Sequence, residues 1–454
     1  MKKRIAALWR AHVLPILAAT VLICFAGLFF WRIAAGYAAA ATLQDLTGDR
    51  AALRTFPLSF DLRDERHLRT VSLRDGAPST DTVLTDPLYA TEYIDRPLSV
   101  TIPGRRDKVG EFRMETAARG AETGIYLYLN FYSRGNAWYS GAMAGAGVFT
   151  GLYTGKPYKP DDFPTFNPSV HSAFIGSTLY YILDNSDPAL GYQGENGLFR
   201  LALDPDTFRP DSADPYRGYV EQPLEYGDAD CIASVGSGTP VLGLAAAGEY
   251  LVLLTRSRDG VTLTLLDQDG NACGSYEAPL QGGRVSYTLC TDTSQGQAVC
   301  AVHLAGYDAG EPLMTNMLDA RFLALRIGAD GFTPLLSAPA SAMRADSLPL
   351  DSVYYLAWRD GKLLVSGLRQ VAPDTTYATY EGASMAVGFF DVYVAVYEPS
   401  DMGSAALLYA GQFDSGMADD NKTQIHSGVY YAGVPPYRTQ YYMLQNYRIE
   451  GDAA

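Results

Sequence analysis

Residues 250–270 read Tyr-Leu-Val-Leu-Leu-Thr-Arg-Ser-Arg-Asp-Gly-Val-Thr-Leu-Thr-Leu-Leu-Asp-Gln-Asp-Gly, and they indicate the fold class of most of the chain. The run Tyr250–Leu254 is continuously apolar, which predicts a strand buried on both faces. The run Val261–Leu265 alternates apolar and polar residues, which predicts a partly exposed strand. An Asp-Gly dipeptide follows each run, and Asp-Gly tolerates the positive φ of tight hairpin turns. The segment therefore predicts an antiparallel meander whose inner strands are packed on both faces.

Similar units recur along the rest of the chain. After residue 55, short runs rich in β-branched, aromatic and leucine residues are divided by Gly, Asp and Pro, and long helical patterns are almost absent. The unit spacing of roughly 45 to 75 residues is a coarse repeat of the kind that propeller blades produce. The hairpins that open the units start near Phe112, Val170, Pro240, Val285, Val353 and Ile425. The sequence therefore predicts an all-β domain.

Phrases such as Leu265-Leu-Asp-Gln-Asp-Gly270 resemble those of divergent β-propellers. In particular, the chain resembles uncharacterised membrane-anchored extracytoplasmic β-propeller-like proteins over most of residues 100–450. This resemblance implies a single β-propeller of six or seven blades that follows one N-terminal transmembrane helix. It assigns no functional residue, because Trp-Asp repeats, sialidase Asp boxes and the tryptophan motifs of quinoprotein propellers are missing from the sequence. Two stacked β-sandwiches or one irregular β domain are the alternative architectures.

The last unit of the sequence is short. Val429–Tyr431 and Tyr441–Ile449 supply about two strands before the chain ends. An early hairpin, formed by Leu58–Leu62 and Thr70–Leu73, could complete that sheet. Such closure joins the two ends of the chain and removes exposed sheet edges, which otherwise invite aggregation.

The N-terminal residues predict a membrane anchor. Four basic residues precede an uncharged run, Val13–Trp31, whose length matches the roughly 20 residues that a membrane-spanning helix needs. Basic residues stay on the cytoplasmic side, which predicts a cytoplasmic N-terminus, a single pass through the cell membrane and an extracytoplasmic C-terminal domain. The expected organisation is a cytoplasmic tail over 1–12, a signal-anchor helix over 13–35, a tether over 36–54 and an extracytoplasmic β-propeller-like domain over 55–454. The alternative is a signal peptide cleaved at the small residues Ala38–Ala40, although signal peptides usually have a shorter apolar core.

The charge distribution restricts the kinds of partner. The net charge of the chain is −15, and its first 44 residues hold five bases and no acid, so the remainder carries −20. A surface this acidic repels nucleic acid, which we exclude as a partner. The expected partners are the lipid bilayer, through Val13–Trp31, and an envelope protein or glycan ligand.

The ectodomain cysteines are too sparse to define the fold. Cys290 and Cys300 flank a turn-like stretch, and they could form a disulfide if the hairpin register placed them opposite each other. The cysteine spacing contains no CxxC element, which argues against a zinc site.

One stretch begins like a calcium-binding loop. Asp267, Asp269 and Asn271 have the alternating spacing of such a loop, but glycine falls at its fourth position. The twelfth position is Ala278 instead of the bidentate glutamate. A hairpin turn therefore explains these residues better than a metal site. The acidic stretch Asp204–Asp230 is likewise interpreted as a solvated surface insertion and not as a metal site.

The remaining candidates for chemistry are weak. The ectodomain histidines are scattered without the spacing of metal ligands, and they are His67, His171, His303 and His426. His303 sits in a strand pattern and is expected to be packed and hydrogen-bonded. No Gly-x-Ser-x-Gly, Walker or His-Glu-x-x-His motif occurs. The sequence therefore assigns no catalytic, cofactor-binding or metal-binding residue.

These observations favour a membrane-tethered extracytoplasmic β-propeller that acts as a binding or scaffold module for a protein or glycan ligand. The stretches Asp204–Asp230, Gln370–Gly388 and Phe413–Gln424 are interpreted as surface insertions, where binding sites usually lie. The alternative is an extracytoplasmic carbohydrate-active enzyme, a glycoside hydrolase or lyase, with paired carboxylates held about 5–10 Å apart. With 50 acidic residues in the chain, the sequence selects no such pair. A structural subunit of an envelope assembly is a third interpretation.

Overall fold

The computed structural model describes residues 15, 17, 19–28, 40–63, 67–84, 98–101, 108–119, 122–133, 136–141, 169–176, 178–184, 196–202, 230–236, 239–293, 296–308, 317–343, 348–350, 353–380, 383–414 and 443–449. These residues form six antiparallel sheets, each built mainly from strands that are consecutive in the sequence. Each sheet runs outward from an inner strand to an outer strand, as the meander at residues 250–270 predicts.

The strands of the first three sheets, given from the inner to the outer edge, are as follows. They are β5 (Leu98–Thr101), β6 (Lys108–Arg119), β7 (Glu122–Ser133) and β8 (Asn136–Gly141); β9 (Ser169–Ile175), β10 (Thr178–Asp184), β11 (Asn196–Ala202) and β12 (Asp230–Val235); and β13 (Val241–Ala247), β14 (Tyr250–Arg256), β15 (Gly260–Leu266) and β16 (Ala272–Pro279).

The other three sheets follow the same plan with two additions from the N-terminus. They are β17 (Arg284–Asp292), β18 (Val299–Tyr307), β19 (Met317–Gly328) and β20 (Gly331–Pro339); β21 (Val353–Arg359), β22 (Lys362–Tyr380), β23 (Ala383–Asp401), β24 (Ser404–Asp414) and β1 (Thr42–Gly48); and β25 (Met443–Ile449), β2 (Leu58–Arg63), β3 (His67–Arg74) and β4 (Ala77–Leu84).

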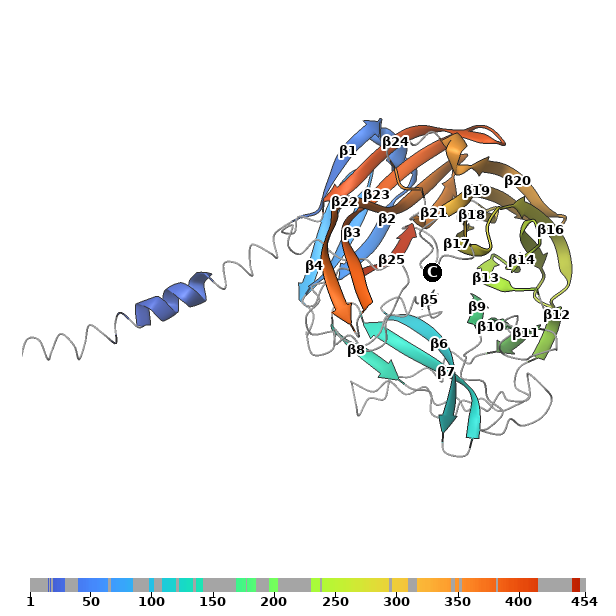
Figure 1. Cartoon of the computed structure of the whole chain (residues 1–454), viewed down its shortest axis with the longest axis horizontal. Helices are drawn as coiled ribbons and strands as arrows, with labels where there is room; N and C mark the ends of the chain where they lie inside the picture. Colours follow the sequence, from blue (N-terminus) through green and yellow to red (C-terminus); the bar gives the residue numbers. More distant parts are fainter. Residues whose placement is uncertain are drawn as a thin grey trace, which may run out of the picture.

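The sheets stand around a common centre, which gives the chain a β-propeller-like all-β fold (Figure 1). The inner strands β9, β13, β17 and β21 are neighbours in that order around the ring. This arrangement confirms the all-β prediction and the unit starts near Val170, Pro240, Val285 and Val353. Phe112 lies within β6 instead of at the start of a unit.

The hydrophobic core lies between neighbouring sheets. β14 is buried along both faces except at its ends, whereas β15 alternates between buried and half-buried positions, as predicted from their sequences. One cluster joins the β13–β16 sheet to the β17–β20 sheet through Val252, Leu263 and Leu323. Because the β13–β16 sheet packs on the β9–β12 sheet and on the β17–β20 sheet, a continuously apolar strand such as β14 is needed at its middle.

The ring closes between the two ends of the described domain. The C-terminal strand β25 pairs antiparallel with β2, and Leu58 lies opposite Ile449. β3 and β4 complete this sheet, so the predicted closure by the early hairpin is confirmed. Val429–Tyr431 and Ile425 lie outside the described residues.

Residues 42–55, expected to belong mainly to the tether, are instead part of the folded domain. β1 adds a fifth strand to the outer edge of the β21–β24 sheet. Gly48 has a φ of 81°, and a Cβ there would collide with the carbonyl oxygen of Leu408. The short 3₁₀ helix η1 (Arg50–Thr55) follows, capped by the Asp49 side chain and fixed by the fully buried Leu53.

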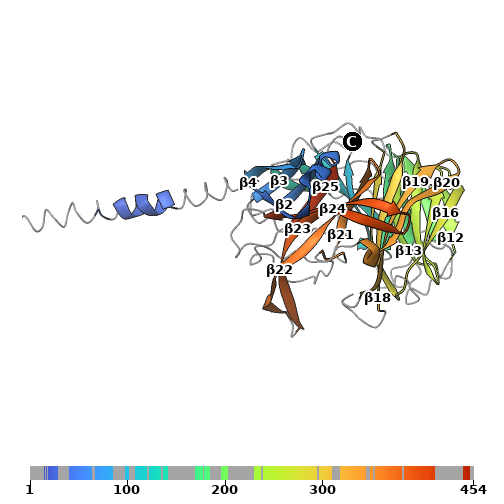
Figure 2. The same ribbon diagram turned by 90° about the horizontal axis from the view of Figure 1, so that it is seen from above.

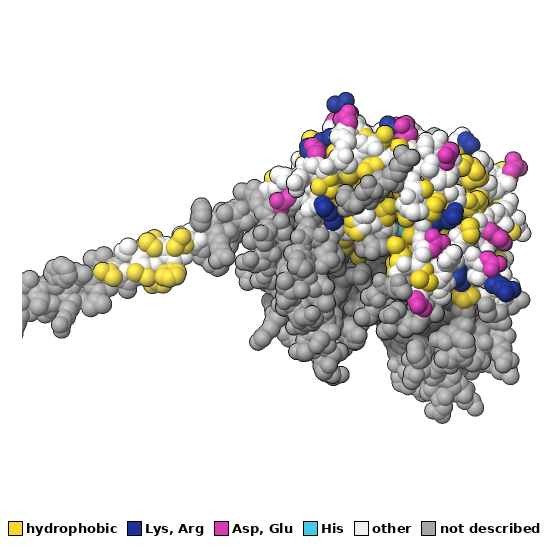
Figure 3. Space-filling model, turned by 45° about the horizontal axis from the view of Figure 1, so that its top comes forward, with side chains coloured by type: hydrophobic (Ala, Val, Ile, Leu, Met, Phe, Trp, Pro, Cys, Tyr) yellow, Lys and Arg dark blue, Asp and Glu magenta, His cyan; other side chains and the backbone are white. Residues whose placement is uncertain are grey.

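The described part of Val13–Trp31 is helical at residues 15, 17 and 19–28. Its large side chains are exposed, with Leu22 at 70% and Phe25 at 69%, and they form the apolar segment beside the domain in Figure 3. Within the residues that the structure describes, no helix has both the length and the hydropathy needed to cross a membrane.

Cys290 and Cys300 are both free thiols. Cys290 lies opposite Ala301, and Cys300 lies opposite Thr291, so the register is one residue away from the one that a disulfide needs. Because side chains alternate between the faces of a strand, the two cysteines point to opposite faces. Cys290 packs between the β17–β20 and β21–β24 sheets, and Cys300 packs towards the β13–β16 sheet.

The stretch Gln370–Gly388, interpreted from sequence as an insertion, is a continuation of β22 and β23. The two strands pair with each other out to Tyr380 and Ala383 and project beyond the body of the domain (Figure 2). The other predicted insertions, Asp204–Asp230 and Phe413–Gln424, lie mostly outside the described residues.

Candidate functional site

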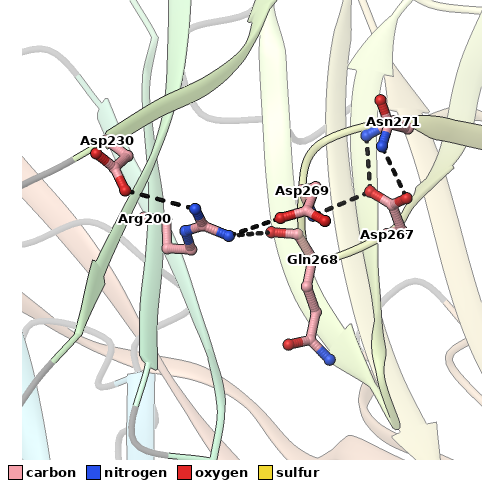
Figure 4. Close-up of polar contacts among 6 residues, drawn as sticks. All are labelled: Arg200, Asp230, Asp267, Gln268, Asp269 and Asn271. Carbon is pink, nitrogen blue, oxygen red and sulfur yellow. Dashed lines mark hydrogen bonds and ion pairs between the residues drawn. The ribbon is translucent and has the colours of Figure 1, made fainter.

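The turn between β15 and β16 contains the residues with calcium-loop spacing. The Asp267 carboxylate accepts hydrogen bonds from the backbone amides of Asp269 and Asn271, at 3.0 and 2.8 Å. It also accepts one from the Asn271 side-chain amide at 2.9 Å (Figure 4). These bonds, led by the Asn271 side chain, hold the pKa of Asp267 below its ordinary value. Because the turn itself occupies both carboxylate oxygens, the hairpin interpretation accounts for these residues.

Arg200 on β11 connects this turn to the neighbouring sheet. Its guanidinium lies 2.8 Å from an Asp269 carboxylate oxygen and donates to the Gln268 carbonyl oxygen at 3.3 Å. On its other side it lies 3.4 Å from the Asp230 carboxylate, at the start of β12. The hydrogen bond to Asp269 is the main cause that raises the pKa of Arg200. The side chains of Asp230 and Asp269 are 70% and 75% exposed, so the cluster presents carboxylate to solvent while it joins two sheets.

The backbone of the turn also packs against the neighbouring sheet. Gly270 has a φ of 83°, and a Cβ there would lie 2.6 Å from the Ile232 carbonyl oxygen on β12. The same relation recurs further along the ring, where Gly331 lies against Gly274 of β16. The Ser337 amide of β20 likewise donates to the Met402 carbonyl oxygen, at 2.7 Å. The outer turn of one sheet thus docks on the outer strand of the sheet before it, which explains why tight turns recur at this position.

A second polar cluster fixes β1 to the domain. The buried Tyr409 hydroxyl donates to Asp45 at 2.5 Å, and Arg50 donates to the same carboxylate oxygen at 2.7 Å. Arg50 also donates to the Leu43 carbonyl oxygen at 2.7 Å. The hydrogen bonds from Arg50 and Tyr409 lower the pKa of Asp45, whereas burial together with the Asp45 carboxylate raises the pKa of Tyr409. Ala41 extends the attachment to the next sheet by donating to the Thr80 hydroxyl at 2.8 Å.

A buried ion pair joins two inner strands. The Arg359 side chain at the end of β21 lies 3.0 Å from the Asp292 carboxylate at the end of β17, and both side chains are only 9% exposed. Thr288 of β17 donates to the Val353 carbonyl oxygen of β21 at 2.7 Å. Thr291 does the same to Ala246 of β13 at 2.7 Å. These contacts tie three consecutive sheets together near the centre of the ring.

The predicted role of His303 is confirmed. It is 2% exposed, its ring centre lies 4.7 Å from that of Phe322, and it is hydrogen-bonded to the backbone of Leu350. Burial lowers the pKa of His303 to about 4, so the imidazole is neutral at physiological pH. His171 lies on β9 and His67 on β3, in different sheets, and His426 is outside the described residues.

No group of three or more His, Cys, Asp or Glu side chains among the described residues could hold a metal ion. Arg200, Arg359 and Asp292 were not singled out from the sequence. Their only signal is a charged residue within or at the end of an otherwise apolar strand pattern, and each has a partner on another sheet.

Comparison with protein-family profiles and with curated proteins finds no match. Among solved structures, a PQQ-bound aldose sugar dehydrogenase from Streptomyces coelicolor has 10% identity and a TM-score of 0.30, covering 78% of this chain and 99% of that one. A putative glucose dehydrogenase from Thermus thermophilus has 13% identity and a TM-score of 0.26, covering 62% and 100%.

A β-fructofuranosidase of glycoside hydrolase family 32 from Bombyx mori, in complex with sucrose, has 11% identity and a TM-score of 0.29, covering 77% of this chain and 82% of that one. At these TM-scores the similarities carry no argument about activity.

Proposed function

We propose that this chain is a membrane-tethered extracytoplasmic platform that binds a protein or glycan ligand. The observation that carries the proposal is the way the chain leaves its apolar N-terminal segment. Only residues 32–40 separate Trp31 from Ala41, which is 4% exposed and already part of the folded domain. Nine residues reach at most about 30 Å. The domain is therefore held close to the apolar segment.

Two further observations support the tether. The described helical residues of Val13–Trp31 expose large apolar side chains, a surface that water does not favour and lipid does. The attachment of β1 through Asp45, Arg50 and Tyr409 then fixes the orientation of the domain relative to the point where the chain enters it. A rigid disc on a short connection suits the presentation of a binding surface.

Membrane extraction tests the tether. The full chain is expected to stay with the membrane fraction in alkaline carbonate, and a Leu22→Arg/Phe25→Arg variant is expected to be released, because each central arginine costs about 2.5–3.5 kcal/mol of insertion free energy. Arginines at the exposed Leu318 and Met402 of the domain serve as the control and are expected to leave extraction unchanged. A mature polypeptide that starts near Leu43 in the medium would refute the tether.

Ligand capture tests the binding role. The full chain in lipid nanodiscs is expected to retain an envelope protein or a glycan from an envelope extract without turning it over. Catalytic turnover of a polysaccharide that is lost on one carboxylate substitution would replace this proposal with the enzymatic alternative.

A further inference from the structure

The strands β22 and β23 extend past the sheet to which their other halves belong (Figure 2). β22 pairs with β21 only as far as Gly367, and β23 pairs with β24 only from Tyr393 onward. Their pairing with each other continues to Tyr380 and Ala383. Within the described part of the chain, residues 370–380 and 383–390 are therefore a two-stranded ribbon with two unpaired outer edges. We call these residues the ribbon.

An isolated two-stranded ribbon is marginally stable in water, and its free edges are templates for pairing with another strand. Natural edge strands are usually protected by lysine, proline or a bulge. The ribbon has one such feature near its base, where the register shifts between Ala372 and Thr376 around Pro373. Beyond that shift, the run Thr376–Tyr380 reads Thr-Tyr-Ala-Thr-Tyr, which is rich in strand-forming residues and contains no lysine or proline.

The charge distribution indicates what can pair there. The chain beyond residue 44 carries −20, so two copies repel each other across most of their surfaces. The ribbon carries only Asp374 among its described residues and no base, and Glu381 follows β22 in the sequence. Repulsion between two copies is therefore weak at the ribbon. A strand that pairs antiparallel with its own copy also forms a closed two-fold interface.

We propose that the ribbon is a dimerisation element, in which Thr376–Tyr380 of β22 pairs antiparallel with the same residues of a second copy. The two ribbons then form one four-stranded intermolecular sheet, and the free edge of β22 disappears. Backbone hydrogen bonds between the two copies supply the attraction. Because Thr376–Tyr380 contains no charged side chain, these two segments can approach each other without repulsion.

Light scattering and sedimentation of the full chain in detergent test this proposal. The wild-type chain is expected to show a concentration-dependent dimer. Ala378→Lys, at the middle of the run, places two ammonium groups beside each other and is expected to weaken the dimer by roughly tenfold. Ser275→Lys adds the same charge at an exposed position of the edge strand β16 and is expected to have no effect. Replacement of residues 371–389 by Asn-Gly is expected to give a monomer with an unchanged melting temperature.

Hydrogen exchange on the same samples provides the second measurement. Amides of Thr376–Tyr380 are expected to be protected at high protein concentration and to exchange rapidly on dilution, whereas amides of β16 should not depend on concentration. A wild-type chain that stays monomeric at every concentration, a dimer that survives removal of the ribbon, or an equal effect of Ser275→Lys would each overturn the proposal.

Discussion

Removal of the Asp292 carboxylate tests how much the inner strands depend on their buried ion pair. At 3.0 Å and an effective dielectric constant of 20, the attraction between the Arg359 and Asp292 charges is about 5.5 kcal/mol. Desolvation of two side chains that are only 9% exposed opposes most of this attraction, so the net value of the pair is small. Asp292→Ala, however, leaves the Arg359 charge buried without this carboxylate, and such a change costs about 3–5 kcal/mol.

The expected change in melting temperature follows from the size of the domain. Unfolding entropy is about 2.1 cal/mol/K per residue, which gives about 0.8 kcal/mol/K for roughly 400 residues. Asp292→Ala should therefore lower the melting temperature of the full chain by about 4–6 °C, measured by calorimetry or circular dichroism. The double variant Asp292→Ala/Arg359→Met also removes the buried Arg359 charge and should recover at least about 2 kcal/mol of the lost stability.

The matched control is the exposed pair between Arg200 and Asp269. It also joins two neighbouring sheets, but the Asp269 side chain is 75% exposed, so its loss should lower the melting temperature far less than loss of the buried pair. If Asp292→Ala and Asp269→Ala lower the melting temperature equally, burial does not set the value of the inner pair and the reasoning fails.

Three further changes test other contacts. Tyr409→Phe should cost about 1 kcal/mol in thermal melts, because water can replace the hydroxyl at the half-exposed Asp45. The pKa of Asp45 is lowered in the folded state, so its contribution to stability should be present above pH ~4 and should disappear as the pH falls through its folded-state pKa. His303 has a folded-state pKa of about 4, below an unfolded value of ~6.5, so stability should fall as pH is lowered through that interval, by on the order of 3 kcal/mol near pH 4. His303→Gln should remove this loss, and an unchanged pH profile in urea titrations would contradict the assignment. Gly270→Ala should destabilise by about 2 kcal/mol or more, because a Cβ would meet the β12 backbone, whereas Gly361→Ala, at a similar φ of 73° with nothing nearby, should cost about 1 kcal/mol.

The sequence was sufficient for features that depend on local pattern. The meander of β14 to β16 follows from one continuously apolar run, one alternating run and two Asp-Gly turns. The closure of the ring by the early hairpin was predicted by counting strands, but the share of each end was not: the sheet takes β25 from the C-terminal end and three strands, β2, β3 and β4, from the N-terminal end, instead of two from each.

Features that depend on register or on distant partners were not predictable. Whether Cys290 lies opposite Cys300 depends on a register difference of one residue, and the amino-acid composition does not reveal the register. β1 buries only Leu43 fully among its large side chains, so it has too weak an apolar pattern to be recognised as a strand. Arg200 acquires its role from Asp269, which lies on another sheet.

The pairing of β25 with β2 also sets the order in which the protein can be completed. Leu58 pairs with Ile449, which is synthesised near the end of translation. Ribosomes add about 5–20 residues each second, so the partner strand is made roughly 20–80 s after Leu58. During that interval the inner edge of β2 is open to strands of other nascent chains. The open edge of β2 therefore needs to be shielded until translation is complete, and a premature stop before Met443 leaves β2 without its C-terminal partner strand.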